Sequence, residues 1–342
     1  MRAAHLLFVL VLAVLAAAGC SAAADPPART TLWTGSREER RIVVQRWDTL
    51  WSVGGSAEDS ILLRPYLLTA TRGGVYLFDA GAKRVLAFSD DGKLRWKTGR
   101  DGAGPAEFRG ARDLKATDEG IFVLDPGNNR IGWLGTDGKW RGAVPLNDVG
   151  HAEQVAPLGD GMFMLLTMKP ESTFVAVDST GKVQSRLSLP WAGFASLDVL
   201  ARQGYIASDA GRWVFGFSIG NGWFAFDHTR MSGEPRSYVE HTEFPEVEAK
   251  QQGPAVSIKL TEYNACSACS MSLTGTTLNV HFGGYTGEGV KRYVDRFDVR
   301  SGQYLGSYLL PVTAQVVEAE GDRLYILAEE PYPILLALRP RS

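Results

Sequence analysis

The pentapeptide Gly120-Ile-Phe-Val-Leu124 has counterparts along the whole chain, each a short hydrophobic run introduced by glycine. Six such runs occur, and they begin at Gly74, Gly120, Gly161, Gly211, Gly275 and Gly321. Successive glycines lie 46, 41, 50, 64 and 46 residues apart. This period matches one four-stranded sheet per repeat, as in a β-propeller blade, and is too long for a leucine-rich repeat.

A second pattern keeps the same period, because several of these runs are followed by another apolar stretch and then a tight turn. The turns are Ser89-Asp-Asp-Gly-Lys93, Gly135-Thr-Asp-Gly-Lys139, Asp178-Ser-Thr-Gly-Lys182 and, more loosely, Val299-Arg-Ser-Gly-Gln303. Glycine provides the positive φ that such hairpins need. Many strands are apolar without alternation, which indicates burial on both faces between neighbouring sheets. The sequence therefore predicts an all-β, six-bladed β-propeller over residues 40–342.

Both ends of the chain bear on ring closure. The last repeat supplies Arg323–Ala328 and Ile334–Leu338 and then ends before an outer strand. Arg41–Trp47, which precedes the first repeat, is left over as a spare strand. An open ring would leave an unpaired edge and two apolar faces in water. We therefore predict that this N-terminal strand closes the last blade.

The connector between the first two repeats carries a resemblance to a known family. Gly102-Ala-Gly-Pro-Ala-Glu-Phe108 resembles the Gly-x-Gly-Pro-Gly-Glu-Phe connector of bacterial six-bladed propellers related to NHL repeats. Gly120–Ile131 is similar to their strand, Asp-x-x-Asn-x-Arg turn and next strand. Ala106 replaces a usual glycine, and repeats three to six keep only the hydrophobic rhythm. The resemblance implies the fold and carries no catalytic motif.

Residues 1–19 are predicted to be a lipoprotein signal peptide. Arg2 precedes Leu6–Ala18, a run of 13 apolar residues, which is shorter than the roughly 20 that span a bilayer. Ala17-Ala18-Gly19-Cys20 resembles the lipobox of bacterial lipoproteins, which implies that Cys20 is lipidated. Ser21 then implies the outer membrane, and residues 20–39 form a tether. A soluble secreted protein with an incidental Cys20 is the alternative.

The overall composition excludes several classes. The chain has 342 residues, of which 45% are hydrophobic, with 36 Lys and Arg against 38 Asp and Glu. This balance leaves no cationic field to gather nucleic acid. Beyond the N-terminal run, no apolar segment is long enough to cross a membrane. We expect a monomeric globule on a lipid anchor in the cell envelope, with no cofactor.

Cys266-Ser-Ala-Cys269 is a CxxC motif in a chain with an export signal. Haem attachment needs a histidine next, but position 270 is serine, and zinc would need a second ligand pair. A local disulfide is the default in an oxidising compartment. A redox or metal role for the pair stays open.

Other polar candidates have a second explanation. Asp79 and Asp125 occupy the same position at the end of the recurring hydrophobic run. Carboxylates at this position could bind a cation or cap the turn that follows. Four histidines remain after cleavage, and none forms an HxH or HxxxH pair: His151, His228, His241 and His281. A metal site would require them to converge in space. No GxSxG elbow or phosphate-binding loop occurs, so we predict no catalytic or metal residues.

Nine aromatic residues lie between Trp191 and Phe226. They could form a stacking platform for a sugar or peptide, with Trp191, Trp213 and Trp223 as candidate ligand-binding residues. Packing between wedge-shaped blades also requires large flat side chains. The long interval from Gly211 to Gly275 also holds the polar stretch Glu240–Gly253, and insertions of this kind often carry specificity.

Two functions fit these observations. The first is a non-catalytic, lipid-anchored binding module whose face or central channel takes a protein, peptide or glycan. The alternative is a propeller hydrolase, lactonase or lyase with a metal site at the channel mouth. Fold analogy alone supports the enzyme, and fold does not determine function.

Overall fold

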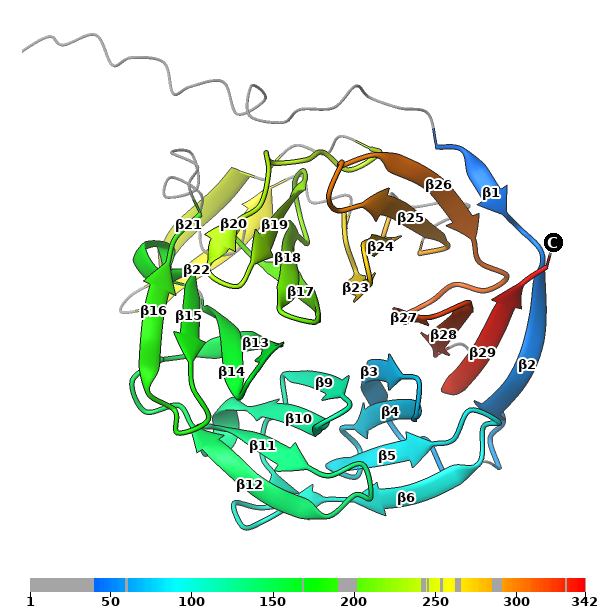
Figure 1. Ribbon diagram of the computed structural model, residues 1–342, viewed down its shortest axis with the longest axis horizontal. Coiled ribbons are helices and arrows are strands. Elements are labelled where there is room, and N and C mark those ends of the chain that lie inside the picture. The colour runs from blue at the N-terminus through cyan, green and yellow to red at the C-terminus, as the bar shows by residue number, and fades with distance from the viewer. Residues whose placement is uncertain are drawn as a thin grey trace, which may run out of the picture.

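A computed structural model describes residues 40–341 apart from 59–60, 168, 190–201, 241–243, 245, 253–254, 262–265, 285–290 and 330. Six sheets, each with four antiparallel strands, stand around a common axis and form a six-bladed propeller, as the sequence predicted (Figure 1). Within the described ranges, no helix is long and apolar enough to cross a membrane.

The first three blades follow one another in chain order. Within each blade the first strand in the chain lies next to the axis and the fourth lies outermost. Their strands are β3 (Pro65–Thr71), β4 (Gly74–Asp79), β5 (Arg84–Phe88) and β6 (Leu94–Thr98) in blade 1; β9 (Asp113–Thr117), β10 (Gly120–Asp125), β11 (Arg130–Leu134) and β12 (Trp140–Pro145) in blade 2; and β13 (Ala152–Gly159), β14 (Met162–Thr167), β15 (Phe174–Val177) and β16 (Val183–Leu187) in blade 3.

The last three blades complete the ring. Their strands are β17 (Gly204–Asp209), β18 (Arg212–Phe217), β19 (Trp223–Asp227) and β20 (Arg230–Met231) in blade 4; β23 (Ser270–Thr274), β24 (Thr277–Phe282), β25 (Tyr293–Asp298) and β26 (Tyr304–Leu309) in blade 5; and β27 (Val316–Glu320), β28 (Arg323–Ala328), β29 (Ile334–Pro340) and β2 (Trp47–Gly54) in blade 6. Two pairs of strands lie outside the blades. One is an antiparallel hairpin of β21 (Glu246–Gln252) and β22 (Ala255–Thr261). The other is a short parallel pair of β7 (Arg100–Asp101) and β8 (Glu107–Phe108). Two 3-10 turns are η1 (Pro126–Asn128) and η2 (Pro170–Ser172).

The recurring hydrophobic runs are the second strands of the six blades: β4, β10, β14, β18, β24 and β28. Every residue of β4 and β10 is buried, because each of these strands lies between the two adjacent blades. The four predicted turns join the third and fourth strands of blades 1, 2, 3 and 5.

The hydrophobic core is divided into six clusters, one at each junction between blades. At the junction that closes the ring, Leu77 and Phe88 of blade 1 belong to the same cluster as Leu327 and Leu335 of blade 6. All four are fully buried, and each such side chain contributes roughly 1.5–3 kcal/mol. The ring is thus held by the packing of its blades against one another.

Ring closure uses a different N-terminal stretch from the one we predicted. The strand that pairs with β29 and completes blade 6 is β2, over Trp47–Gly54. Within Arg41–Trp47, β1 (Ile42–Val44) instead pairs in parallel with β26 of blade 5. The physical reason is burial: Trp51 and Val53, on one face of β2, pack against the cluster that joins blades 6 and 1.

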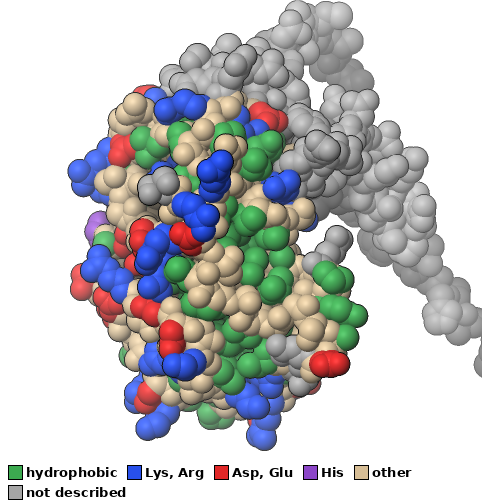
Figure 2. Space-filling view, turned by 90° about the vertical axis from the view of Figure 1, so that its right-hand side faces the viewer, with side chains coloured by type: hydrophobic (Ala, Val, Ile, Leu, Met, Phe, Trp, Pro, Cys, Tyr) green, Lys and Arg blue, Asp and Glu red, His purple; other side chains and the backbone are tan. Residues whose placement is uncertain are grey.

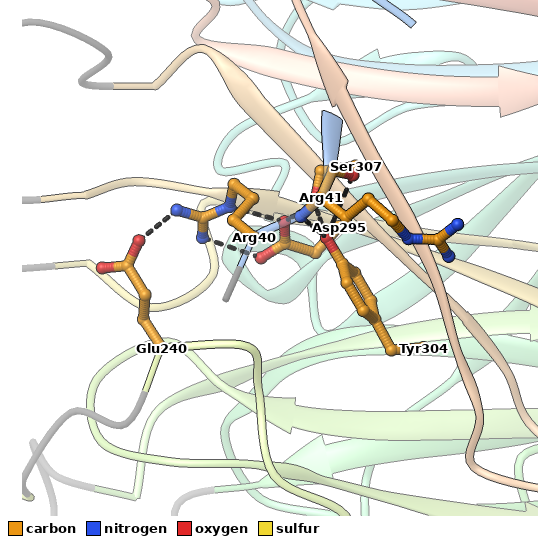
Figure 3. A network of polar contacts seen from close by, with 6 residues as sticks. All are labelled: Arg40, Arg41, Glu240, Asp295, Tyr304 and Ser307. Atoms are coloured by element: carbon orange, nitrogen blue, oxygen red, sulfur yellow. Dashed lines mark hydrogen bonds and ion pairs between the residues drawn. The ribbon is translucent and has the colours of Figure 1, made fainter. Parts of the chain in front are cut away.

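Arg40 fixes the start of the described chain to blade 5 (Figure 3). Its Nε lies 2.9 Å from Oδ1 of Asp295, and its guanidinium also pairs with Glu240. The same group lies 4.5 Å from the ring centres of Phe282 and Tyr293. Since Asp295 is almost completely buried, Arg40 supplies the charge that this carboxylate needs.

The rim that carries β1 and β2 has an apolar surface. Figure 2 shows hydrophobic side chains mainly in the middle of this side of the ring, with charged ones toward the left, the top and the bottom of the view. Ile42, Val43 and Leu50 are exposed there. The N-terminal segment therefore covers the blade edges with its backbone and leaves some apolar side chains facing outward.

Candidate functional site

The axis of the ring is lined by the innermost strand of each blade: β3, β9, β13, β17, β23 and β27 (Figure 1). These strands mix buried and partly exposed residues, whereas β4 and β10 are buried throughout. The difference arises because an innermost strand has solvent in the channel on one side. The channel contains two cavities, one toward each end of these strands.

The start-side cavity, near the beginnings of the innermost strands, has a volume of about 620 Å³. Aromatic and polar side chains line it, including Tyr66, Tyr205, Gln154 and Gln315. Charged groups of both signs are present, and Arg112 lies 3.9 Å from Glu153 at its wall. Such a mixed lining suits a polar ligand with hydrogen-bonding groups.

The end-side cavity, near the ends of the same strands, has a volume of about 670 Å³. Its lining contains five carboxylic side chains: Asp118, Glu119, Asp209, Glu318 and Glu320. Two cationic side chains, Arg72 and Lys115, oppose them. With Glu318 protonated, the other four carboxylates exceed the two cations by two negative charges, so this end favours cations.

The two cavities meet at Lys115, Met271 and Glu318, which line both of them. Lys115 Nζ lies 3.5 Å from Oδ1 of Asp113, two residues earlier on the same strand. No described residue forms a hydrogen bond or ion pair with the Glu318 carboxyl. This carboxyl is therefore available to a ligand or a proton in the middle of the channel.

Burial perturbs the carboxyls along the channel. It raises the pKa of Glu318 from 4.5 to about 8, although the charge of Lys115 acts in the opposite direction. Burial also raises the pKa of Asp113, and it raises that of Glu320. A carboxyl that changes protonation near neutral pH can accept or donate a proton, and such groups occur often at functional sites.

The Asp113 carboxylate also joins two blades. Its Oδ2 accepts a hydrogen bond from the backbone N–H of Val155, on the innermost strand of the next blade, at 3.0 Å. Thr69 and Gln154 accept similar backbone hydrogen bonds from Ala116 and Ile206 at the flanking junctions. These bonds join the innermost strands of blades 1 to 4 to one another along the channel.

The candidate tryptophans do not form an accessible platform. Trp213 is fully buried between blades 3 and 4, where it stacks on Phe226 with ring centres 4.0 Å apart. Trp223 is buried between blades 4 and 5, against Phe297. Neither ring can stack on a ligand while the blades are packed, so these two residues serve the core. Trp191 lies outside the described residues.

Cys266 and Cys269 lie together beside the channel. Their sulfur atoms are 2.9 Å apart, both thiols are free and half-buried, and Cys269 lines the start-side cavity. The predicted disulfide stays a prediction. Cys20 and its tether lie outside the described residues.

Asp79 and Asp125 hold the loops that enter their blades. Asp79 accepts hydrogen bonds from the backbone N–H groups of Leu63, Arg64 and Gly81, each at 2.9 Å. Asp125 accepts one from Gly110 at 2.8 Å. The N–H groups around these carboxylates explain their burial, and they support the turn-capping interpretation over cation binding.

The Gly102–Phe108 connector has a structural role as well. Glu107 accepts a hydrogen bond from the N–H of Gly104 at 2.7 Å, and Arg130 donates to the carbonyl of Glu107 at 2.7 Å. A Cβ at Gly102, where φ is +147°, would lie 2.2 Å from a Glu107 carboxylate oxygen. The residues that carry the NHL resemblance thus shape a loop.

The described histidines do not converge. His151 pairs with Glu153 at 2.7 Å, His228 is exposed on a turn, and His281 is buried in blade 5. Burial lowers the pKa of His281 to about 4, so it is neutral. Within the part of the chain that the structure describes, no group of three His, Cys, Asp or Glu side chains could hold a metal ion. His241 lies outside that part.

Comparison with known proteins bears on the fold. The sequence matches no protein-family profile and no curated protein. Among solved structures, a Bacteroides fragilis protein inferred to be exported is similar, with a TM-score of 0.57 and 10% identity over 89% of this chain and 98% of that one.

Two further structures have comparable likeness. Virginiamycin B lyase from Staphylococcus aureus has a TM-score of 0.51 and 13% identity, over 86% of this chain and all of the lyase. A member of the DUF4221 family from Bacteroides vulgatus has a TM-score of 0.50 and 11% identity, over 87% and 98% of the two chains. At such identities the likeness shows the propeller fold and nothing finer.

Sequence reasoning missed the channel residues Lys115, Glu318 and Glu320. Their only signal is position: each lies in the short stretch beside a hydrophobic run, at an innermost strand. Alternating polar residues there could have indicated a channel-facing side. The sequence could not show that these side chains line one cavity. Blade 2 and blade 6 are far apart in the chain, and they face the same channel because the ring closes.

Proposed function

We propose that this chain is a lipid-anchored, extracytoplasmic binding module whose channel takes a cationic group of a peptide or glycan. The observation that carries the proposal is the excess of carboxyls over cations around the end-side cavity. The unpartnered Glu318 carboxyl lies where this cavity meets the start-side cavity. A ligand can therefore place an amine among the end-side carboxylates, donate a hydrogen bond to the Glu318 carboxyl and lay the rest of its surface along the channel wall.

Location supports the same role. The lipobox resemblance at Ala17–Cys20 implies a lipid anchor, and Ser21 implies the outer membrane. Such an anchor would hold a monomeric ring in the envelope, where peptides and glycans are present. The NHL resemblance of the first two blades is compatible with this role, because it carries no catalytic motif.

The test uses the mature chain with two amine-bearing probes, hexalysine and an oligomer of glucosamine. We expect saturable binding of one or both by calorimetry, weakened by added salt. The matched neutral probe, an oligomer of N-acetylglucosamine, should bind at least about tenfold more weakly. Equal binding of charged and neutral oligomers, or no binding of either amine probe, would overturn the proposal.

Variants locate the binding site. Asp118→Asn combined with Glu320→Gln removes two carboxylates from the end-side cavity and should weaken binding by about tenfold. Glu58→Gln combined with Glu234→Gln changes two exposed residues that line neither cavity, so it is the matched control and should leave binding unchanged. An equal loss of affinity for the amine probes in both variants would show a general effect of net charge and not binding in the end-side cavity.

An enzymatic role is the second candidate, and one observation favours it. Glu318 has a pKa of about 8, so it could act as a general acid or base at neutral pH without a metal ion. Mass spectrometry of the probes after incubation distinguishes the two functions. Intact probes indicate binding alone, whereas cleaved probes that persist intact with Glu318→Gln indicate catalysis.

A further inference from the structure

The Cys266–Cys269 loop is held rigidly by its neighbours. Backbone N–H groups of Gly283 and Gly284 donate to the Cys266 carbonyl at 2.9 and 3.2 Å. The backbone N–H of Cys269 donates to the carbonyl oxygen of His281 at 2.8 Å. The backbone N–H of Ser267 donates to the carbonyl oxygen of Ser218, also at 2.8 Å. The loop is thus fixed to blade 5 on one side and to blade 4 on the other.

This frame sets the two sulfurs 2.9 Å apart as thiols. A disulfide bond is about 2.05 Å long, so the sulfurs need to approach by less than about 1 Å to form one. The reduced and oxidised pairs therefore fit nearly the same loop. Because the closed loop would be only four residues long, a disulfide there constrains the unfolded chain little and adds little stability.

The two sulfurs differ in accessibility and acidity. Cys269 lines the start-side cavity, whereas Cys266 does not. The sulfur of Cys266 lies 2.9 Å from the carbonyl oxygen of Ala268. The hydrogen bond between the two sulfurs, together with the positive charge of Lys291, lowers the pKa of Cys269. The same hydrogen bond raises the pKa of Cys266. One thiol is therefore set to ionise at the cavity while the other stays protonated behind it.

We propose that Cys266 and Cys269 form a reversible thiol–disulfide exchange site that opens into the channel. The substrate class is a disulfide carried by a peptide or a small molecule that fits a cavity of about 620 Å³. This inference is independent of the proposed amine binding, since it concerns a different group of atoms and needs no cationic ligand.

The exchange balances without a further reactant. The Cys269 thiolate attacks one sulfur of the substrate disulfide, forms a mixed disulfide and releases the other substrate sulfur as a thiolate. Cys266 then loses its proton to solvent and attacks the Cys269 sulfur, which releases the second substrate thiolate. The cysteine pair is oxidised by two electrons and the substrate disulfide is reduced to two thiols. The reverse sequence oxidises a substrate dithiol.

The first experiment equilibrates the full mature chain in glutathione buffers from mainly reduced to mainly oxidised. Acid quenching, alkylation and mass spectrometry then give the fraction of disulfide. We expect that fraction to pass from almost none to almost complete across the series. A pair that stays oxidised in excess reduced glutathione is an inert structural bridge, and a pair that never oxidises is not an exchange site; either result overturns the proposal.

The second experiment separates the two roles with oxidised glutathione as the probe. Cys266→Ser and Cys266→Ala should each trap one glutathione on Cys269, whereas Cys269→Ser should react at least about tenfold more slowly. Retention of the wild-type melting temperature confirms that each variant is folded. Equal reactivity of Cys266 and Cys269 in the single variants, or no adduct on Cys269, would overturn the assignment.

Discussion

The side chain of Glu318 illustrates how an ordinary residue type acquires an unusual property from its position. Its carboxyl lies in the channel, where Asp113, Glu320 and Lys115 act on it electrostatically, and burial raises its pKa to about 8. The folded protein therefore binds this proton more tightly than the unfolded chain, whose glutamate has a pKa of 4.5. The resulting stability is complete below about pH 4.5 and is lost as the pH rises through 8.

Replacing Glu318 with glutamine tests this property. The free energy of unfolding of the wild type should fall between pH 5 and pH 8 relative to that of Glu318→Gln, by on the order of 2 kcal/mol because channel water screens the charge. Chemical denaturation at several pH values measures the difference. Parallel curves for the two proteins would show that Glu318 titrates at its ordinary pKa.

Asp125 gives a second prediction for a single residue. Asp125→Ala should lower the free energy of unfolding by about 2–3 kcal/mol, because the N–H of Gly110 and the amide of Asn128 lose their acceptor. The matched control is Asp137→Ala on an exposed turn, which should cost less than about 1 kcal/mol. Denaturation in urea measures both. A melting temperature of the wild type that rises with added Ca²⁺ would instead favour a cation site at Asp125.

The two N-terminal strands make separate contributions among the elements. Deleting residues 40–46 removes β1 and the Arg40–Asp295 pair but keeps β2 on blade 6. Deleting residues 40–54 also removes β2, which leaves the edge of β29 unpaired and exposes the core that Trp51 and Val53 cover.

We expect the shorter deletion to lower the melting temperature while unfolding stays cooperative. The longer deletion should cost at least about 5 kcal/mol, from two partly buried side chains, the core that they cover and a lost strand ladder, and should promote aggregation. Calorimetry with light scattering distinguishes the two. Identical melting of both deletions would show that β2 does not close the ring.

The elements also show which parts of the fold were predictable. The six second strands and the four hairpin turns are encoded in short stretches, because a fully buried strand needs a continuous apolar run and a tight turn needs glycine. The sequence predicts an N-terminal closing strand, which the structure has, but several residues too early. Arg41–Trp47 and Trp47–Gly54 both have strand composition, and only packing against blades 6 and 1 distinguishes them.

At the scale of the whole molecule, the resemblance of Ala17–Cys20 to a lipobox predicts where the ring is held. The full chain expressed in a bacterium should partition into detergent, and Cys20→Ser should move nearly all of it to the soluble fraction. Cys266→Ser is the control, because it removes a thiol without affecting an anchor. Phase partitioning followed by immunoblotting measures the change. Detergent partitioning of Cys20→Ser equal to that of the wild type would contradict the anchor.

The sequence by itself determined the number of blades, their second strands and their turns. For the aromatic residues it left two interpretations open, packing between blades and stacking on a ligand. Local patterns suffice for these features, since each blade is built from neighbouring residues. Only the tertiary structure decided between the uses of Trp213 and Trp223, which lie between blades. It also placed Glu318 beside Lys115 and Cys269 beside the channel. Closure of the ring brings Lys115 of blade 2 and Glu318 of blade 6 to the same cavities, and no local pattern records that convergence.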